Sequence, residues 1–230
     1  MWRPAQIVSD RTHHLAEPVG RIVGKTGIHP NTLTIFGFLI NFGVAWVISQ
    51  GLFALGGALI LVAGIFDLLD GAVARVMGKV TKFGGLLDST LDRYSEAVLL
   101  FGLLWYYAWR QPNSTEMALI FVTIVGSLLV SYVRARAEGL HLDAEVGIFR
   151  RTLRITALSL GLILSTLPNN RETVMLVTLW VLAVGTNVTA IHRLIHVWRT
   201  TQKERLKSPD NPERATISHG ERTGTPGRQP

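Results

Sequence analysis

The longest run without an ionisable side chain covers 37 residues, from Pro30 to Phe66. A helix of about 20 residues crosses the hydrocarbon core of a bilayer, so this run is long enough for two crossings. Two further charge-free runs extend from Met117 to Val133 and from Thr173 to Ile191. Such runs are not typical of a water-soluble globular protein. The sequence therefore predicts an integral membrane protein.

Turn-forming residues divide the apolar segments into six expected spans. Ser49-Gln50-Gly51 is the expected turn inside the long neutral run, and Pro168-Asn169-Asn170 separates the last two segments. The predicted fold is all-α, a bundle of six transmembrane helices within a membrane domain of residues 1–200. The expected helices cover residues 31–49, 52–76, 84–109, 115–138, 150–167 and 172–197.

The two ends of the chain differ from this bundle. Leu15, Val19, Ile22 and Val23 share one helix face, which predicts an amphipathic helix over residues 15–28 on the membrane surface. Residues 201–230 are rich in Pro, Gly, Ser, Thr and charged side chains. We expect this segment to be a disordered polar tail.

Positive charge is distributed unevenly along the chain. Of the 23 lysines and arginines, 20 fall in the terminal segments and around the loops after the second and fourth expected helices. Because such segments stay on the cytoplasmic side, we expect a multi-pass protein of the cell membrane with both termini in the cytoplasm. The net charge of +7 then fits contact with the lipid bilayer, and we expect no nucleic-acid partner. The absence of cysteine excludes disulfides and thiol nucleophiles.

Four aspartates lie within 26 residues where the second expected helix ends and the third begins. Asp67 and Asp70 are three residues apart, and Asp88 and Asp92 are four apart, so each pair shares a helix face. A short loop makes the two helices antiparallel neighbours, with the pairs facing each other near the cytoplasmic surface. Each carboxylate costs about 2.5–3.5 kcal/mol at a membrane-helix centre, and clustered carboxylates repel one another. Two Mg²⁺ or Mn²⁺ ions would relieve this repulsion and could bind a phosphate.

Small residues accompany the aspartates. Gly71, Ala74 and Gly84 each lie one helical turn from an aspartate and share its face, which leaves room for a ligand. Arg75 at the membrane edge can bind a phosphate through two parallel hydrogen bonds. We therefore expect a phosphate-containing ligand between the two helices.

Together these positions form the pattern D-x2-D-G-x2-A-R-x8-G-x3-D-x3-D. With this signature, the chain resembles the CDP-alcohol phosphotransferase family over residues 15 to about 197. The resemblance implies a membrane enzyme of phospholipid biosynthesis and a homodimer. In its reaction an acceptor hydroxyl attacks the β-phosphate of a CDP-linked alcohol, here CDP-diacylglycerol, and CMP leaves.

The resemblance also implies roles for individual residues. Asp67, Asp70, Asp88 and Asp92 would bind two Mg²⁺ or Mn²⁺ ions, and Asp92 would also act as the general base. Other residues would contact the CDP-alcohol. These are Asn31, Thr32, Leu33, Thr34, Gly71, Ala74, Arg75, Thr81 and Gly84.

Five arginines between positions 134 and 154 indicate an acceptor that itself carries a phosphate. The segment S-Y-V-R-A-R-A-E from Ser131, followed by G-x3-R-x2-R from Gly147, resembles the phosphatidylinositol phosphate synthases. Arg136, Arg151 and Arg154 are accordingly expected to bind the acceptor phosphate. Inositol phosphate is the favoured acceptor.

Several alternatives stay open at this point. Thr152 and Leu153 replace a Pro-Glu pair of that group, so glycerol 3-phosphate, and with it a phosphatidylglycerophosphate synthase, is a second acceptor hypothesis. Another CDP-alcohol phosphotransferase is a third. A cation transporter that uses the aspartates as its ion path is the alternative outside the enzymes. Glu96, one turn beyond Asp92, is either a partner of the site or a buried neutral acid.

Overall fold

The structure is a computed structural model that describes residues 30–76, 81–168 and 170–207. Within these ranges the side chains of Pro30, residues 65–76 and residues 204–207 are not described. The amphipathic helix expected over residues 15–28 and the tail from residue 208 onward lie outside the described residues.

All regular structure in the described residues is helical, and its six helices coincide with the six expected spans. α6 ends at Leu164, ahead of Pro168, whereas the expected helix continued to residue 167. The helices are α2 (Pro30–Ser49), α3 (Phe53–Val76), α4 (Lys82–Trp109), α5 (Ser114–Glu138), α6 (Arg151–Leu164) and α7 (Arg171–Lys207).

The last helix corrects the expected start of the tail. α7 continues to Lys207, so residues 201–207 are helical and are not part of a disordered segment. The sequence Gln-Lys-Glu-Arg-Leu-Lys at 202–207 consists of residues with high helix propensity.

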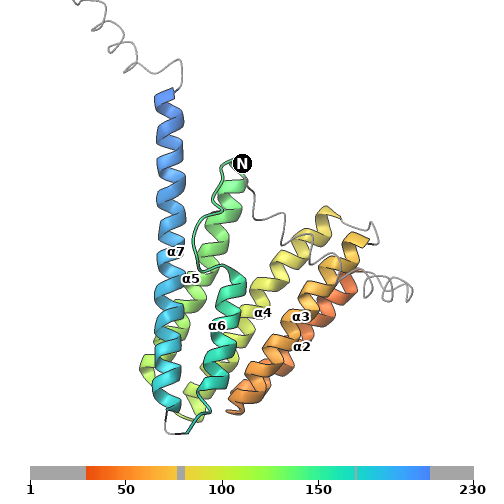
Figure 1. The fold of residues 1–230 in the computed structure, drawn as a ribbon, viewed down its shortest axis with the longest axis vertical. Helices are drawn as coiled ribbons and strands as arrows, with labels where there is room; N and C mark the ends of the chain where they lie inside the picture. Colours follow the sequence, from red (N-terminus) through yellow and green to blue (C-terminus); the bar gives the residue numbers. More distant parts are fainter. Residues whose placement is uncertain (1–29, 77–80, 169, 208–230) are drawn as a thin grey trace, which may run out of the picture.

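Each helix packs mainly against two others, in the cyclic order α2, α3, α6, α7, α5, α4 and back to α2. Figure 1 shows α5, α6 and α7 on one side of the molecule and α2, α3 and α4 on the other. The α3–α6 and α4–α5 contacts join the two groups. As a result α3 and α4, which follow each other in the sequence, both pack against α2 and are not each other's main packing partners.

The bundle has the outer surface of a membrane protein. Among the residues with described side chains, three helical segments are long and apolar enough to cross a bilayer: Asn31–Ser49, Ser114–Glu138 and Arg171–Lys203. α4 has sufficient length with 28 residues, but it carries the acids Asp88, Asp92 and Glu96. α6, with 14 residues, spans only about 21 Å. Large apolar side chains such as Trp46, Phe121 and Trp180 point outward, as in a bundle that contacts lipid. The predicted all-α membrane bundle is confirmed.

Glycines set the closest approaches between helices. A Cβ atom added to Gly102 of α4 would lie 2.4 Å from the carbonyl oxygen of Ala45 in α2. On the other side of the bundle, the buried Ser159 hydroxyl of α6 donates a hydrogen bond to the Gly57 carbonyl of α3, at 2.8 Å. Small residues allow this approach, which is a common way for membrane helices to associate.

We expect Gly102→Ala to lower the melting temperature in detergent, because its methyl group overlaps the Ala45 backbone. Overpacking of this kind costs about 1–3 kcal/mol. Gly43→Ala is the matched control, since an added Cβ there has no atom within 4 Å and alanine favours a helix. Thermal denaturation followed by size-exclusion chromatography compares the two; an equal melting temperature for both variants contradicts the close packing.

Candidate active site

A cavity of about 320 Å³ lies between α2, α3, α4 and α6. Its wall includes the carboxylates of Asp88 and Asp92 from α4 and the guanidinium of Arg151 from α6. A larger groove of about 500 Å³ on the α5 side of α4 contains Arg93 as its one charged side chain among the described residues. The first cavity is therefore the candidate active site, because it alone of the two combines carboxylates with a cation.

The start of α4 places both carboxylates. Thr81 is the N-cap residue, and its side chain accepts a hydrogen bond from the Gly84 amide at 2.9 Å. This cap fixes the first turn of the helix at Lys82. Asp88 and Asp92 then follow one turn apart and both reach the cavity.

The other two aspartates belong to α3, whose backbone is helical through Val76. Their side chains are outside the described part, so their predicted metal-binding role stays a prediction. Ala63 and Gly64 of α3 line the cavity, and Asp67 follows them by one helical turn along the chain. Asp70 follows by a further turn. The oxygen donors of Asp88 and Asp92 are of the type that Mg²⁺ and Mn²⁺ prefer, so the described half of the expected donor set fits these ions.

Three of the residues expected to contact the CDP-alcohol lie together where α2 and α4 begin. A Cβ atom added to Gly84 would lie 3.0 Å from Thr81 Oγ1 and 3.1 Å from Asn31 Oδ1. Residues 32–34 are in the first turns of α2, next to Asn31. Gly71, Ala74 and Arg75 are in the last turns of α3, where the side chains are not described.

The three arginines expected to bind the acceptor phosphate have different environments. Arg151 lines the cavity, and its Nη2 atom is 2.9 Å from Asp92 Oδ1, with side-chain exposures of 33% and 23% respectively. Arg154 is only 3% exposed and pairs with Glu96. Arg136 is exposed near the end of α5 and is not part of the cavity wall. The structure thus places one of the three arginines at the carboxylates.

The cavity wall also contains polar residues that the sequence analysis did not select as site residues. Asn41 of α2 and Ser95 of α4 both line the cavity, and the Asn41 amide donates to the Ser95 hydroxyl at 3.3 Å. Asn41 is a polar amide in the middle of an expected membrane span, a signal that could have marked it as a site residue. Because both residues are buried, they place hydrogen-bonding groups on the inner wall of the cavity.

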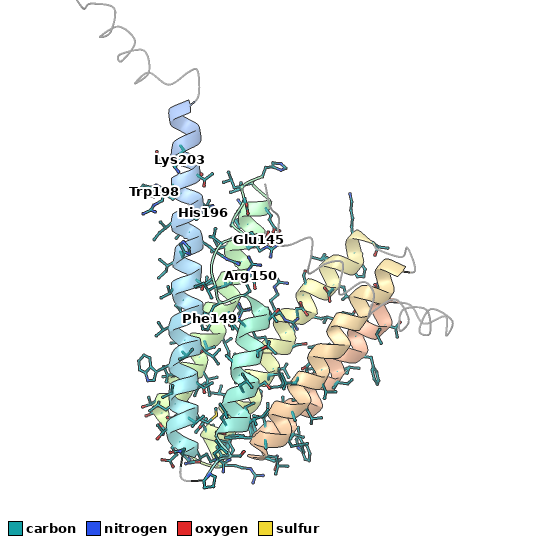
Figure 2. All side chains as sticks on the ribbon, viewed as in Figure 1. Glu145, Phe149, Arg150, His196, Trp198 and Lys203 are labelled. Atoms are coloured by element: carbon teal, nitrogen blue, oxygen red, sulfur yellow. The ribbon has the colours of Figure 1, made fainter. Side chains whose placement is uncertain are left out.

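Arg193 of α7 is a further residue whose role becomes visible only in the fold. Its buried guanidinium donates to the carbonyl of Val146 at 2.8 Å and to that of Val130 at 2.7 Å. The loop between α5 and α6 is thereby held against α7. Figure 2 shows Glu145, Phe149 and Arg150 of this loop beside α7, with His196, Trp198 and Lys203 further toward the C-terminal end of that helix.

Comparisons with known proteins identify a family model and several similar proteins. The family model for CDP-alcohol phosphatidyltransferase matches residues 27–190. The phosphatidylinositol phosphate synthase of Mycobacterium marinum is 32% identical over 217 residues, which cover 93% of each chain. The crystal structure of Mycobacterium tuberculosis phosphatidylinositol phosphate synthase with CDP-DAG bound is 30% identical, with a TM-score of 0.76 over 86% of this chain and 97% of that one. The structure of the same enzyme with manganese and citrate has a TM-score of 0.75 at 30% identity and covers 86% and 91%.

The matched residues run from the segment before α2 into α7, so they contain the whole aspartate motif and the candidate cavity. The match to the M. marinum protein extends over nearly the full length of both chains. This agreement favours the enzyme over the cation transporter considered from the sequence. The chain is a membrane-bound phosphotransferase that belongs to the CDP-alcohol phosphatidyltransferase family.

Proposed function

We propose that this enzyme transfers the phosphatidyl group of CDP-diacylglycerol to a hydroxyl of inositol phosphate and releases CMP. The observation that carries the proposal is one cavity that holds Asp88 and Asp92 opposite Arg151. Carboxylates suit the cations that accompany a pyrophosphate, and an arginine suits a phosphate on the acceptor. The names of the similar proteins support the same donor and acceptor.

Asp67, Asp70, Asp88 and Asp92 are proposed to hold two Mg²⁺ or Mn²⁺ ions. When bound, the ions neutralise the pyrophosphate and make CMP a better leaving group. The oxygen donors of the described pair support this assignment, as does the manganese in the M. tuberculosis structure. The residues proposed to hold the CDP part are Asn31, Thr32, Leu33, Thr34, Gly71, Ala74, Arg75, Thr81 and Gly84.

In the proposed reaction the acceptor oxygen forms a bond to the β-phosphorus of CDP-diacylglycerol. The bond from that phosphorus to the bridging oxygen breaks, and CMP leaves with this oxygen. The Asp92 carboxylate takes the proton of the attacking hydroxyl. Arg151, 2.9 Å from Asp92, is close enough to bind the acceptor phosphate while the hydroxyl reaches that carboxylate. Because Arg136 and Arg154 are not part of the cavity wall, the proposal for the acceptor phosphate rests on Arg151.

The active site and both termini are proposed to lie on the cytoplasmic side of the cell membrane. The site is at the end of the bundle where α2 and α4 begin, and this end adjoins the Lys- and Arg-rich segments. A homodimer, as the resemblance to the family implies, is part of the proposal. The partners of the enzyme are then a second copy, the bilayer, CDP-diacylglycerol and the phosphorylated acceptor.

CMP release from labelled CDP-diacylglycerol tests the acceptor. We expect CMP to appear fastest with inositol phosphate, slowly with unphosphorylated inositol, and only when Mg²⁺ or Mn²⁺ is present. A higher rate with glycerol 3-phosphate would instead identify a phosphatidylglycerophosphate synthase. Ion flux in the absence of nucleotide would instead support the cation-transporter hypothesis.

Asp92→Asn is expected to lower kcat by about 10²–10⁴-fold, since the amide can neither accept the proton nor replace a metal-binding carboxylate. Elution volume and melting temperature measure whether the variant folds. Asp143→Asn, the same change in the exposed loop after α5, is the control and should keep full activity. Comparable turnover by both variants rules out Asp92 as the general base.

Gly84→Ala should raise KM for CDP-diacylglycerol about tenfold, because the added methyl group crowds Asn31 and Thr81 where the nucleotide is proposed to bind. Gly85→Ala is the neighbouring control, since its Cβ would have no atom within 4 Å. Steady-state kinetics at a fixed acceptor concentration measure KM for CDP-diacylglycerol in the two variants. Equal KM values for both would place the nucleotide elsewhere.

A further inference from the structure

Two ion pairs connect α4 to α6, one turn apart. In the outer pair, Arg151 of α6 contacts Asp92 of α4 at the cavity. In the inner pair, Arg154 contacts Glu96. The acids are spaced by four residues and the arginines by three, so each helix presents both of its members on one face.

The inner pair is the more strongly constrained of the two. Arg154 Nε is 2.6 Å from Glu96 Oε1 and Arg154 Nη2 is 2.7 Å from Glu96 Oε2, which makes the contact bidentate. The side chains are 3% and 6% exposed. A charged pair at this depth is stable only if both groups remain well paired, so its geometry leaves little freedom to either helix.

Arg154 also fixes the beginning of its own helix. Its Nη1 atom donates to the Phe149 carbonyl, which precedes α6, at 3.0 Å. Arg150 occupies the N-cap position without a side-chain capping hydrogen bond. The guanidinium therefore ties together α4, α6 and the end of the loop that leads into α6.

The backbone of α6 packs mainly against α3 and α7, while the two arginines form its ion pairs with α4 among the described residues. Arg151 precedes Arg154 by less than one turn, so a shift of α6 along or away from α4 moves both together. A displacement near 1 Å is enough to impair a reaction that depends on alignment.

We infer that Glu96 and Arg154 form a buried positioning pair that sets α6 against α4 and thereby holds Arg151 at the cavity for the acceptor phosphate. This inference rests on the proposed acceptor role of Arg151. It assigns Glu96 a function in acceptor binding without contact to either substrate. Arg154, which the sequence predicted to bind the acceptor phosphate, is then a positioning residue.

The decisive variant is the double substitution Glu96→Leu/Arg154→Met. A single substitution leaves a buried charge without its partner and can prevent folding, whereas replacing both partners by apolar residues is often neutral for stability. We expect a melting temperature close to that of the wild type. KM for inositol phosphate should rise about tenfold, while kcat at saturating acceptor and KM for CDP-diacylglycerol change less than about threefold.

Arg154→Lys is the second variant, in case the double variant fails to fold. Lysine keeps the charge but cannot form the bidentate contact, so we expect the same selective rise in KM for inositol phosphate. Ser159→Ala is the matched control. It removes a different buried hydrogen bond of α6, the one to Gly57 of α3, and should leave both KM values unchanged.

A wild-type KM for inositol phosphate in the folded double variant, or in Arg154→Lys, overturns the inference. An equal loss for both substrates also overturns it, because that pattern indicates general damage to the fold. Arg151→Gln, measured in parallel, tests the underlying proposal separately. An unchanged acceptor KM in Arg151→Gln refutes the acceptor role of Arg151, whatever the pair variants show.

Discussion

Charged side chains inside a membrane bundle must be compensated by opposite charges, hydrogen bonds, ions or water, and this requirement organises the centre of the molecule. α4 carries Asp88, Asp92 and Glu96 on the side that faces α2, α3 and α6. The deepest of these acids, Glu96, is neutralised by Arg154. Asp92 is in contact with Arg151 where the cavity begins, so the demand for compensation becomes weaker toward the end of the bundle that receives the substrates.

The cyclic packing order explains why a cavity exists at this place. α3 and α4 both pack against α2 without being each other's main partners, and the space between them is bordered by α2 and α6. Helices that packed directly on each other along their whole length would leave no room for a pyrophosphate between their acidic faces. Arg151, proposed to bind the acceptor, lines this cavity, whereas Gly84, Asn31 and Thr81, proposed to bind the nucleotide, lie together where α2 and α4 begin and are not part of the cavity wall.

Much of the fold could be predicted because hydropathy and turn residues are local properties. The charge-free run ending at Phe66 required two helices, and Ser49 is indeed the last residue of α2. The end of α7 was misplaced because a polar segment was taken for an irregular one, although its residues favour a helix. For Glu96, the sequence left a site partner and a neutral acid as equal alternatives. Its bidentate contact with Arg154 could not be anticipated, because the two residues are 58 positions apart.

The sequence by itself determined the number and position of the helices, the family, and the spacing of the acids along their helices. The helices and the spacing of the acids follow from composition and helical periodicity within short segments, and the family follows from the resemblance of the aspartate signature. Which of Arg136, Arg151 and Arg154 reaches the carboxylates was decided only by the tertiary structure. The reason is physical: whether a side chain faces a cavity depends on the rotation and depth of its helix against its neighbours, and those are set by glycine contacts and buried ion pairs between distant segments.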